Sequence, residues 1–234
     1  MLFRRRRHRD ETNDLGHDLP PGARHYRAFV GPPQNYDIIA AMQFNLLTGA
    51  GLREHHNLLD IGCGSLRAGR LFIPFLLPGH YYGLEPDRWL VEQGINKEIG
   101  RDLVRIKRPV FEHNSEFKLT VFGRQFDYLM AQSIFSHAAP AQIDKCLREA
   151  RKVMHPESVF LATYVPGAEN HKGSEWVYPG CVNYTEARMI QFAREADLIA
   201  QPQPWQHPHD QKWLMITRPA TGQETESENK EAVS

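Results

Sequence analysis

The chain has 234 residues, with 28 Lys and Arg against 28 Asp and Glu, so its formal net charge is zero. This length suits one domain with a full hydrophobic core, and a neutral chain is not built as a general binder of polyanions.

The two ends of the chain differ from its middle. A basic run, RRRRHR, lies within residues 1–24, and residues 220–234 are acidic and poor in apolar side chains. We expect both to be disordered tails that flank one domain over residues 25–219. No apolar segment follows the arginines, and no stretch approaches the roughly 20 apolar residues of a membrane span. The three cysteines form no CxxC pair, so we expect a reducing, cytoplasmic location.

Segments with helical and strand-like patterns alternate through the middle of the chain. Helical spacing of apolar residues predicts helices over residues 35–51, 65–77, 86–99, 139–154 and from Thr185 onward. We expect Pro74 to kink or shorten the second of these helices. Short apolar runs predict strands over residues 57–61, 80–85, 108–113, 126–132, 158–165 and 212–218. This order predicts an α/β fold with a doubly wound, mostly parallel sheet, whose ligands lie at the carboxyl ends of the strands.

A glycine-rich loop follows the first predicted strand. In NLLDIGCGSLRAGR, Gly62, Cys63 and Gly64 lie at the carboxyl end of that strand, where the next helix directs its free N–H groups. A phosphate or a carboxylate would be stabilised there. Many tight turns also use Gly-x-Gly, and Arg67 stands where the dinucleotide fingerprint has its third glycine.

Two acidic residues narrow the choice of ligand. Glu85 ends the second predicted strand about 20 residues past the loop, the spacing at which a carboxylate accepts both hydroxyls of a ribose. The alternative is a surface glutamate at a strand end. Asp60 lies two residues before Gly62, where it would repel a pyrophosphate and suit an ammonium group. S-adenosylmethionine (SAM) has an ammonium, a carboxylate and a ribose but no phosphate.

At these residues the sequence resembles the class I SAM-dependent methyltransferases. LLDIGCGS is similar to the first motif of that family, YYGLEP to the second, and FDYLMAQSIFSH to the motif of the fourth strand. The resemblance implies a SAM site made of these residues: Asp60, Gly62, Cys63, Gly64, Glu85, Glu116, Phe117, Gln132 and Ser133. Within that set, Glu116 and Phe117 are expected to bind the adenine amine and ring.

The resemblance also implies a fold and a lid. It covers residues 57–165 and departs at the turn Pro156-Glu157-Ser158, where the family commonly has Pro-Gly-Gly. It implies a seven-stranded, Rossmann-like sheet with helices on both faces and an amino-terminal helical lid over the cofactor. Candidates in the lid to touch SAM or the acceptor are Tyr26, Tyr36 and Gln43.

Methyl transfer requires alignment of the reactants and exclusion of water, rather than a metal ion or a covalent intermediate. His137, just after the fourth predicted strand, is the candidate general base for a hydroxyl acceptor. An equal alternative is a histidine that packs against the next helix. The long connection after the fifth strand offers acceptor-pocket candidates, against simple packing: Tyr164, His171, Trp176 and Tyr178.

Three further sequence features bear on a metal site, on the partners of two arginines and on nucleic-acid substrates. His207, His209 and Asp210 lie close in the sequence but lack helical spacing, so we predict no metal site. Arg67 and Arg70, one helical turn apart, meet either acids or an anionic acceptor. No Asn/Asp-Pro-Pro-Tyr/Phe follows the fourth strand, which disfavours methylation of nucleic-acid bases.

The sequence therefore predicts a SAM-dependent methyltransferase that moves a methyl group by in-line displacement to a small molecule, with a hydroxyl as the favoured acceptor. One alternative is a SAM-binding regulator or partner subunit without catalysis. A second is an NAD-dependent oxidoreductase with an irregular fingerprint. A third is an RNA or protein methyltransferase that docks through RRRRHR.

Overall fold

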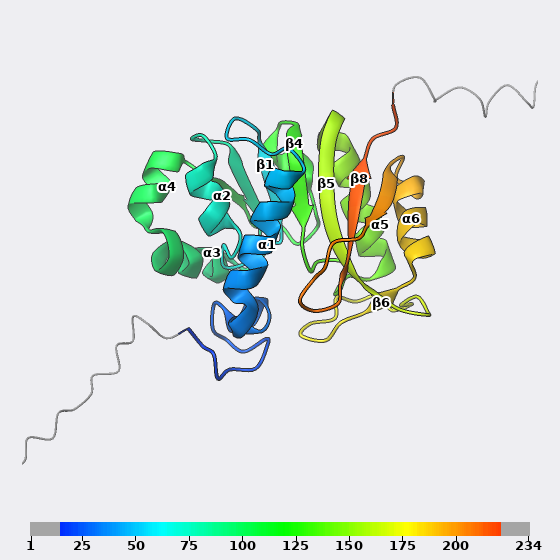
Figure 1. Cartoon of the computed structure of the whole chain (residues 1–234), viewed down its shortest axis with the longest axis horizontal. Coiled ribbons are helices and arrows are strands. Elements are labelled where there is room, and N and C mark those ends of the chain that lie inside the picture. Colours follow the sequence, from blue (N-terminus) through cyan, green and yellow to red (C-terminus); the bar gives the residue numbers. More distant parts are fainter. Residues whose placement is uncertain (1–14, 221–234) are drawn as a thin grey trace, which may run out of the picture.

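The computed structural model describes residues 15–220 of the chain (Figure 1). The RRRRHR run and the acidic residues 221–234 lie outside the described residues. Residues 15–24, which the sequence assigns to the tail, form turns in which the N–H of Gly22 donates to the carbonyl of Ala28 at 2.8 Å. Within residues 15–220, no helix is both long enough and apolar enough to cross a membrane.

One sheet runs through the centre of the molecule. Its strands are β1 (Leu58–Ile61), β2 (Tyr81–Leu84), β3 (Val110–Glu112), β4 (Phe126–Ala131), β5 (Met154–Pro166), β7 (Ile199–Gln203) and β8 (Lys212–Thr217). They lie in the order β3-β2-β1-β4-β5-β8-β7, and a two-residue strand, β6 (Asn183–Tyr184), pairs with β5. The strands β1 to β5 are parallel, whereas β8 is antiparallel to both β5 and β7. This confirms the predicted doubly wound, mostly parallel sheet.

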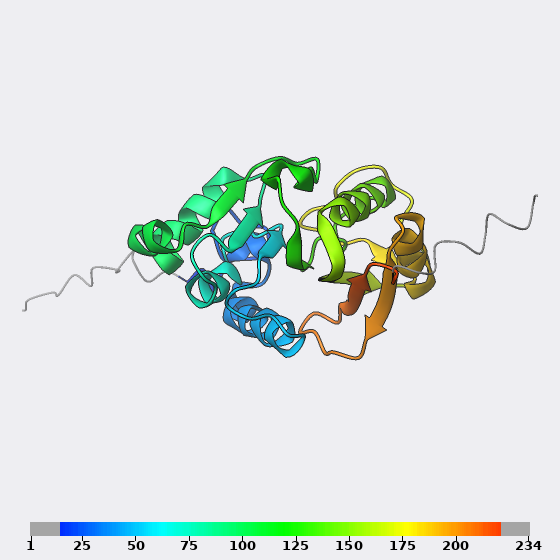
Figure 2. The same ribbon diagram turned by 90° about the horizontal axis from the view of Figure 1, so that it is seen from above.

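Helices cover both faces of this sheet (Figures 1 and 2). The α-helices are α1 (Tyr36–Gly49), α2 (Gly69–Phe75), α3 (Arg88–Gly94), α4 (Arg101–Lys107), α5 (Pro140–Val153) and α6 (Glu186–Glu195). Shorter helical turns are η2 (Ala28–Val30), η3 (Pro33–Asn35), η4 (Ile95–Ile99) and η5 (Leu119–Phe122). The helix α2 is shorter than the predicted segment and ends one residue after Pro74. Thr185 caps α6 as predicted, since its hydroxyl accepts the N–H of Arg188 at 3.2 Å.

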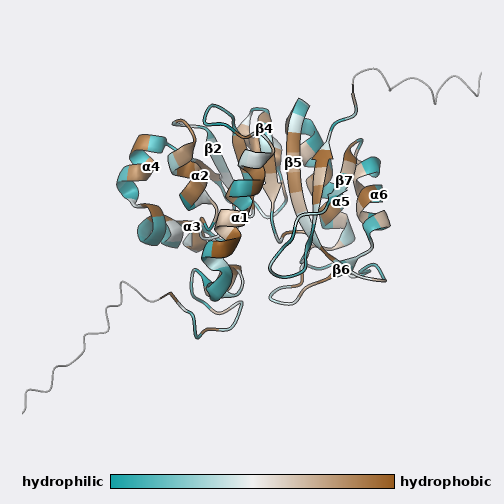
Figure 3. Ribbon diagram, in the orientation of Figure 1, coloured by the Kyte–Doolittle hydropathy of each residue, from teal (hydrophilic) through white to brown (hydrophobic). Residues whose placement is uncertain are grey.

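Alternation along the central strands divides the core into two clusters. Successive side chains of a strand point to opposite faces. Leu59 and Leu129 therefore pack with the apolar faces of α5 and α6. Leu58 and Met130 pack on the other face with residues of α1 and α2. In Figure 3 the central strands are mainly hydrophobic, whereas α6 shows both hydrophobic and hydrophilic residues. Burial on both faces stabilises the parallel sheet. Because β1, β2 and β4 run in the same direction, their carboxyl ends meet at one edge.

Candidate functional site

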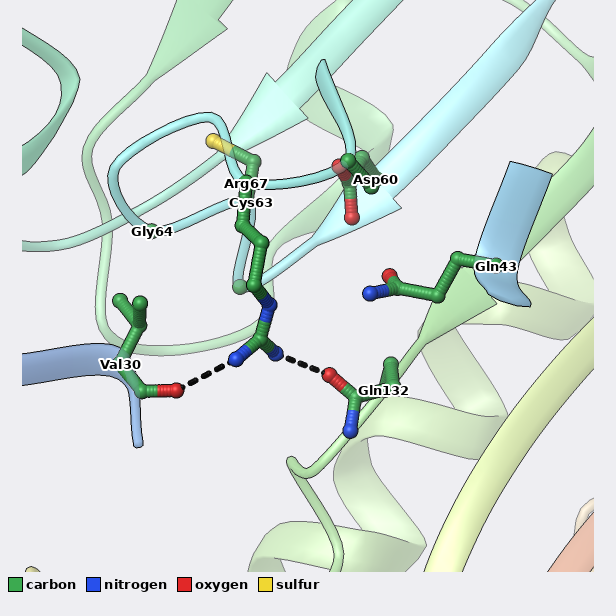
Figure 4. A pocket seen from close by; sticks show the side chains of 9 residues that line it. Val30, Gln43, Asp60, Cys63, Gly64, Arg67 and Gln132 are labelled. Carbon is green, nitrogen blue, oxygen red and sulfur yellow. Dashed lines mark hydrogen bonds between the residues drawn. The ribbon is translucent and has the colours of Figure 1, made fainter. Parts of the chain in front are cut away.

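A cavity of about 720 Å³ opens where β1, β2 and β4 end. Its walls come from the amino-terminal segment, the loop after β1, the end of β2, the segments after β3 and β4, and the connections after β5 and β7. A small recess adjoins it, bordered by Gln43, Asp60, Cys63, Arg67 and Gln132 (Figure 4). The cavity is thus built from segments distant in sequence that the sheet brings to one edge.

The loop after β1 needs both of its glycines. Gly62 and Gly64 have φ angles of 73° and 54°, in the left-handed region that glycine adopts without strain. A Cβ atom at Gly62 would collide with Ile134, and one at Gly64 would lie 2.7 Å from the Cγ1 of Val30. Glycine at both positions therefore lets Ile134 and Val30 pack closely on the loop, and both glycines line the cavity.

Glu85 lies directly after β2 and holds that loop in place. Its Oε2 accepts the N–H of Gly64 and its Oε1 accepts the N–H of Asp87, each at 3.0 Å. Each carboxylate oxygen keeps a second lone pair with which to bind a ligand. The side chain lines the cavity and is buried, and this burial raises the pKa of its carboxyl to about 7.

Asp60 borders the recess from β1. Its Oδ2 accepts the hydroxyl of Tyr81 at 2.7 Å, and no cation of residues 15–220 forms an ion pair with it. Burial raises the pKa of this carboxyl to about 6. A buried acid that lacks a cation is costly to keep ionised, and a cationic ligand would lower that cost.

All but one of the remaining predicted cofactor residues line the recess or the large cavity. Cys63 and Gln132 border the recess, while Phe117, Gln132 and Ser133 line the large cavity. Ser133 has a φ of 60°, and its N–H donates to the Oγ1 of Thr163 at 2.7 Å. Glu116 lies elsewhere: its side chain is 70% exposed and forms an ion pair with Lys145.

The two residues just before Glu116 line the cavity, whereas Glu116 itself does not. These residues are Asn114 and Ser115, and Phe117 lines the cavity beside them. Phe117 has a φ of 51°, so the chain turns sharply at this point. The sequence gives no strong signal for this turn, because the segment after β3 has neither helical nor strand periodicity.

His137 lines the cavity and is also packed in place. Its Nδ1 lies 3.0 Å from the carbonyl of Val177 and 2.8 Å from that of Gly180. Carbonyl oxygens only accept hydrogen bonds, so Nδ1 carries the proton and Nε2 of the neutral ring keeps its lone pair. Burial lowers the pKa of this histidine, which favours the neutral form.

Two of the four acceptor-pocket candidates reach the cavity. Trp176 and Tyr178 line it, with ring centroids 5.6 Å and 5.1 Å from that of His137. The hydroxyl of Tyr178 is buried without a hydrogen-bond partner in the structure. Tyr164 instead belongs to the core over α5 and α6, and His171 packs against Tyr184.

Of the three lid candidates, one reaches the site. Gln43 borders the recess from α1. The hydroxyl of Tyr36 donates to the carbonyl of Ser65 at 3.1 Å, and Tyr26 packs edge-on against Tyr36. Before α1, the residues that line the cavity are Pro21, Phe29, Val30, Gly31 and Pro32. They lie in short turns, and so they lack the periodicity that would single them out.

The histidines after β7 close another wall of the site. His207 lies 3.1 Å from Gln132, and His209 lines the cavity and lies 2.9 Å from Asn35. Burial lowers the pKa of His207 to about 4, so the ring is neutral. In the part of the chain that the structure describes, no group of three or more His, Cys, Asp or Glu side chains is placed to hold a metal ion.

The two arginines that the sequence left open have different partners. Arg70 forms ion pairs with Asp37 at 2.5 Å and Glu98 at 3.3 Å. Arg67 donates to the carbonyl of Val30 at 2.7 Å and to the side-chain oxygen of Gln132, both neutral groups.

Comparison with known proteins shows a match to a family model and similarity in fold to solved structures. Residues 59–160 match a family model described as a methyltransferase domain. The magnesium protoporphyrin IX methyltransferase ChlM from Synechocystis PCC 6803, solved with bound S-adenosylhomocysteine (SAH), is similar at a TM-score of 0.60 and 13% identity, over 80% of this chain and 87% of that one. The mitomycin 7-O-methyltransferase MmcR is similar at a TM-score of 0.62 and 17% identity, over 87% of this chain and 60% of its own. The glycopeptide N-methyltransferase MtfA has a TM-score of 0.59 and 10% identity, over 77% and 90%.

Proposed function

We propose that this chain is a SAM-dependent methyltransferase of class I and that it transfers the methyl group to a hydroxyl of a small molecule by in-line displacement. SAM is its cofactor, and it supplies a methyl group activated by attachment to a sulfonium. The chain itself has to hold the cofactor, orient the acceptor, exclude water and accept a proton.

The residues at the edge of the sheet fit this cofactor. We assign the ribose hydroxyls to Glu85, whose two oxygens each keep a free lone pair beyond the bonds from Gly64 and Asp87. We assign the ammonium to Asp60, a buried carboxylate without a cation in residues 15–220. Gly62 and Gly64 both line the cavity, and we assign the backbone of this loop to contact with the cofactor.

The adenine and the reacting centre take the remaining residues. We assign the adenine to the wall that holds Phe117, with Asn114 and Ser115 in place of Glu116. Gln132 and Ser133 stand between this wall and His137 along the chain and line the same cavity. They are proposed to border the cofactor near its sulfur.

The observation that carries the choice of a hydroxyl is the pair of carbonyls that faces Nδ1 of His137, from which we infer that the ring proton lies on Nδ1. With Nδ1 bonded to two carbonyls, Nε2 is free to accept the proton of a hydroxyl as its oxygen attacks the methyl carbon. The carbonyls of Val177 and Gly180 then stabilise the imidazolium that forms, because both face the Nδ1–H. A neutral amine would not need this base.

Aromatic side chains are proposed to shape the acceptor end and keep water out. Phe29, Trp176 and Tyr178 line the cavity around His137, and the centroids of Phe29 and Tyr178 are 5.3 Å apart. These walls suit an acceptor with a flat apolar body that carries a hydroxyl.

The proposal is tested by transfer of labelled methyl from SAM to a panel of phenols, alcohols, amines and thiols, with the position of the methyl group identified by mass spectrometry. We expect methyl ethers as products. The His137→Gln variant should turn over the best acceptor at least about tenfold more slowly, while its affinity for SAH stays unchanged. Products methylated only on nitrogen or sulfur, or full turnover by His137→Gln, would contradict the proposal.

A further inference from the structure

Gln211, just before β8, holds its amide in a fixed orientation at the wall of the cavity. The residue is buried and lines the cavity. The hydroxyl of Thr163 accepts the N–H of Ser133 at 2.7 Å and donates to Oε1 of Gln211 at 2.6 Å. Nε2 of Gln211 donates to Oγ of Ser133 at 2.9 Å. An amide nitrogen carries two hydrogens, so one N–H of Gln211 has no partner among residues 15–220.

His209, two residues earlier, supplies a second N–H of the same kind. Its Nε2 lies 2.9 Å from the amide nitrogen of Asn35, which can only donate, so Nε2 accepts and the proton of the neutral ring lies on Nδ1. The residue lines the cavity, and within residues 15–220 no group accepts this Nδ1–H. Burial lowers the pKa of His209, which favours the neutral ring.

This polar wall, made of His209 and Gln211, lies beside the turn that carries the proposed base. Gln211 bonds to Ser133, and Oγ of Ser133 lies 3.1 Å from Oγ of Ser136, the residue just before His137. Ser133, His137, His209 and Gln211 all line the cavity apart from Ser136. The polar wall is therefore close to the position at which an acceptor hydroxyl would react.

The polar wall offers donors without a positive charge. Among the residues that line the cavity, Arg67 is the only arginine or lysine, and its guanidinium donates to Val30 and Gln132. A carboxylate at the polar wall would lose its hydration without gaining a cation, which is costly. A carbonyl oxygen is neutral, accepts two N–H bonds and donates none, so it matches this pair of donors.

We propose that His209 and Gln211 bind a carbonyl oxygen of the acceptor, so that the enzyme selects hydroxylated aromatic compounds that also carry a ketone. This inference rests on the proposed function and names its substrate class. The acceptor hydroxyl meets His137, while the carbonyl oxygen accepts the Nδ1–H of His209 and the second N–H of Gln211. An acceptor without the carbonyl leaves both N–H groups unpaired in a site closed to water, and a site of this kind rejects such an analogue strongly.

The test compares two phenols of matched shape. One is a hydroxyphenyl ketone, used as its ortho, meta and para isomers, and the other is the alkylphenol in which CH₂ replaces the carbonyl. Wild type should methylate the best ketone with a kcat/KM at least about 30-fold above that of its alkylphenol. His209→Phe and Gln211→Met each remove one donor. Each should lower kcat/KM for the ketone about tenfold and leave that for the alkylphenol within about threefold.

Gln206→Met is the matched control, because Gln206 is exposed on the same connection and does not line the cavity. It should leave kcat/KM for both phenols unchanged. Calorimetric titration with SAH should give affinities within about twofold of wild type for all three variants. Weaker SAH binding in both His209→Phe and Gln211→Met would overturn the inference, because it would assign the two donors to the cofactor.

The wild-type enzyme supplies the decisive outcomes even if Gln211→Met does not fold. Equal kcat/KM for the ketone and its alkylphenol would overturn the inference, and so would a preference for the corresponding hydroxybenzoate, which carries a carboxylate in place of the ketone. A preference for the ketone that His209→Phe abolishes supports it. Absence of any methyl ether from the whole panel of phenols and alcohols would instead refute the proposed function.

Discussion

Two groups of charged side chains meet near the start of α2, and they differ in how their charges are paired. In the ion-paired cluster, Arg27 and Arg70 share the carboxylates of Asp37 and Glu98. In the unpaired group, Asp60, Glu85 and Arg67 have only neutral protein partners among residues 15–220. Both groups contain buried residues, so burial alone does not separate them.

The two groups differ in role. The ion-paired cluster joins the amino-terminal segment, α1, α2 and η4, and its charges satisfy one another. The unpaired group lies at the carboxyl edge of the sheet, where burial raises the pKa of Asp60 to about 6 and that of Glu85 to about 7. A buried charged side chain that has no oppositely charged partner in the protein usually marks a functional site, because a ligand supplies that partner.

The largest expected effect separates the two groups by stability. Glu98→Ala should lower the free energy of unfolding by about 3 kcal/mol, because among residues 15–220 it leaves the two arginines with the exposed Asp37 as their remaining carboxylate partner. Chemical denaturation measures this loss. Affinity for SAH should stay within about twofold of wild type, after allowance for unfolded protein. Asp37→Ala is the matched control and should cost less than about 1 kcal/mol. A stable Glu98→Ala that has lost SAH binding would break the distinction.

The next effect is on affinity. Glu85→Ala should weaken SAH binding about 100-fold, because it removes the acceptor for two hydroxyls and the bonds that hold Gly64 and Asp87. Calorimetric titration of the folded variant measures this change. Its melting temperature without ligand should also fall, because the N–H groups of Gly64 and Asp87 lose their acceptor. Wild-type affinity in Glu85→Ala would remove this residue from the site.

A smaller effect is the pH dependence of the unpaired group. Asp60 and Glu85 both have raised pKa values in the fold, so their contribution to stability is present at low pH and is lost as pH rises through about 6 and about 7. A ligand that binds the ionised forms reverses this trend. The increase in melting temperature given by SAH should therefore grow between about pH 5.5 and about pH 8 in wild type, and the upper part of that growth should vanish in Glu85→Ala. A constant increase over this range would contradict the account.

The smallest effect concerns an acid outside the cavity. Glu116→Ala should change SAH affinity by less than about twofold, because this side chain is 70% exposed and paired with Lys145. The comparison with Glu85→Ala under identical conditions is the measurement. A large loss of affinity would restore Glu116 to the adenine site and show that the segment around Phe117 rearranges on binding.

Much of the fold could be predicted because its signals are local. Short apolar runs mark β1, β2, β4 and β5, and the glycines and Glu85 stand at the strand ends where ligands bind. β7 was not predicted, because Pro202 interrupts its pattern. Pro202 is tolerated because, among residues 15–220, β7 pairs only with β8, at the edge of the sheet.

The parts of the site that the sequence does not predict depend on the direction in which side chains point, rather than on the spacing of residue types along the chain. Arg67 and Arg70 were expected on one helix, but α2 begins only at Gly69, so Arg67 lies in the turn before it and reaches the recess. Phe29 and Val30 line the cavity from a single helical turn, which is too short for periodicity. Which way such side chains face is set by tertiary packing, and spacing along the chain does not encode it.

We expect the unpaired group to bind an amino-acid nucleoside rather than a dinucleotide. Calorimetric titration of the purified chain with SAH and, in parallel, with NADH measures this preference. SAH should bind in the micromolar range, and NADH should not bind. Binding of NADH alone would contradict it, and would mean that the loop from Gly62 to Gly64 holds a pyrophosphate.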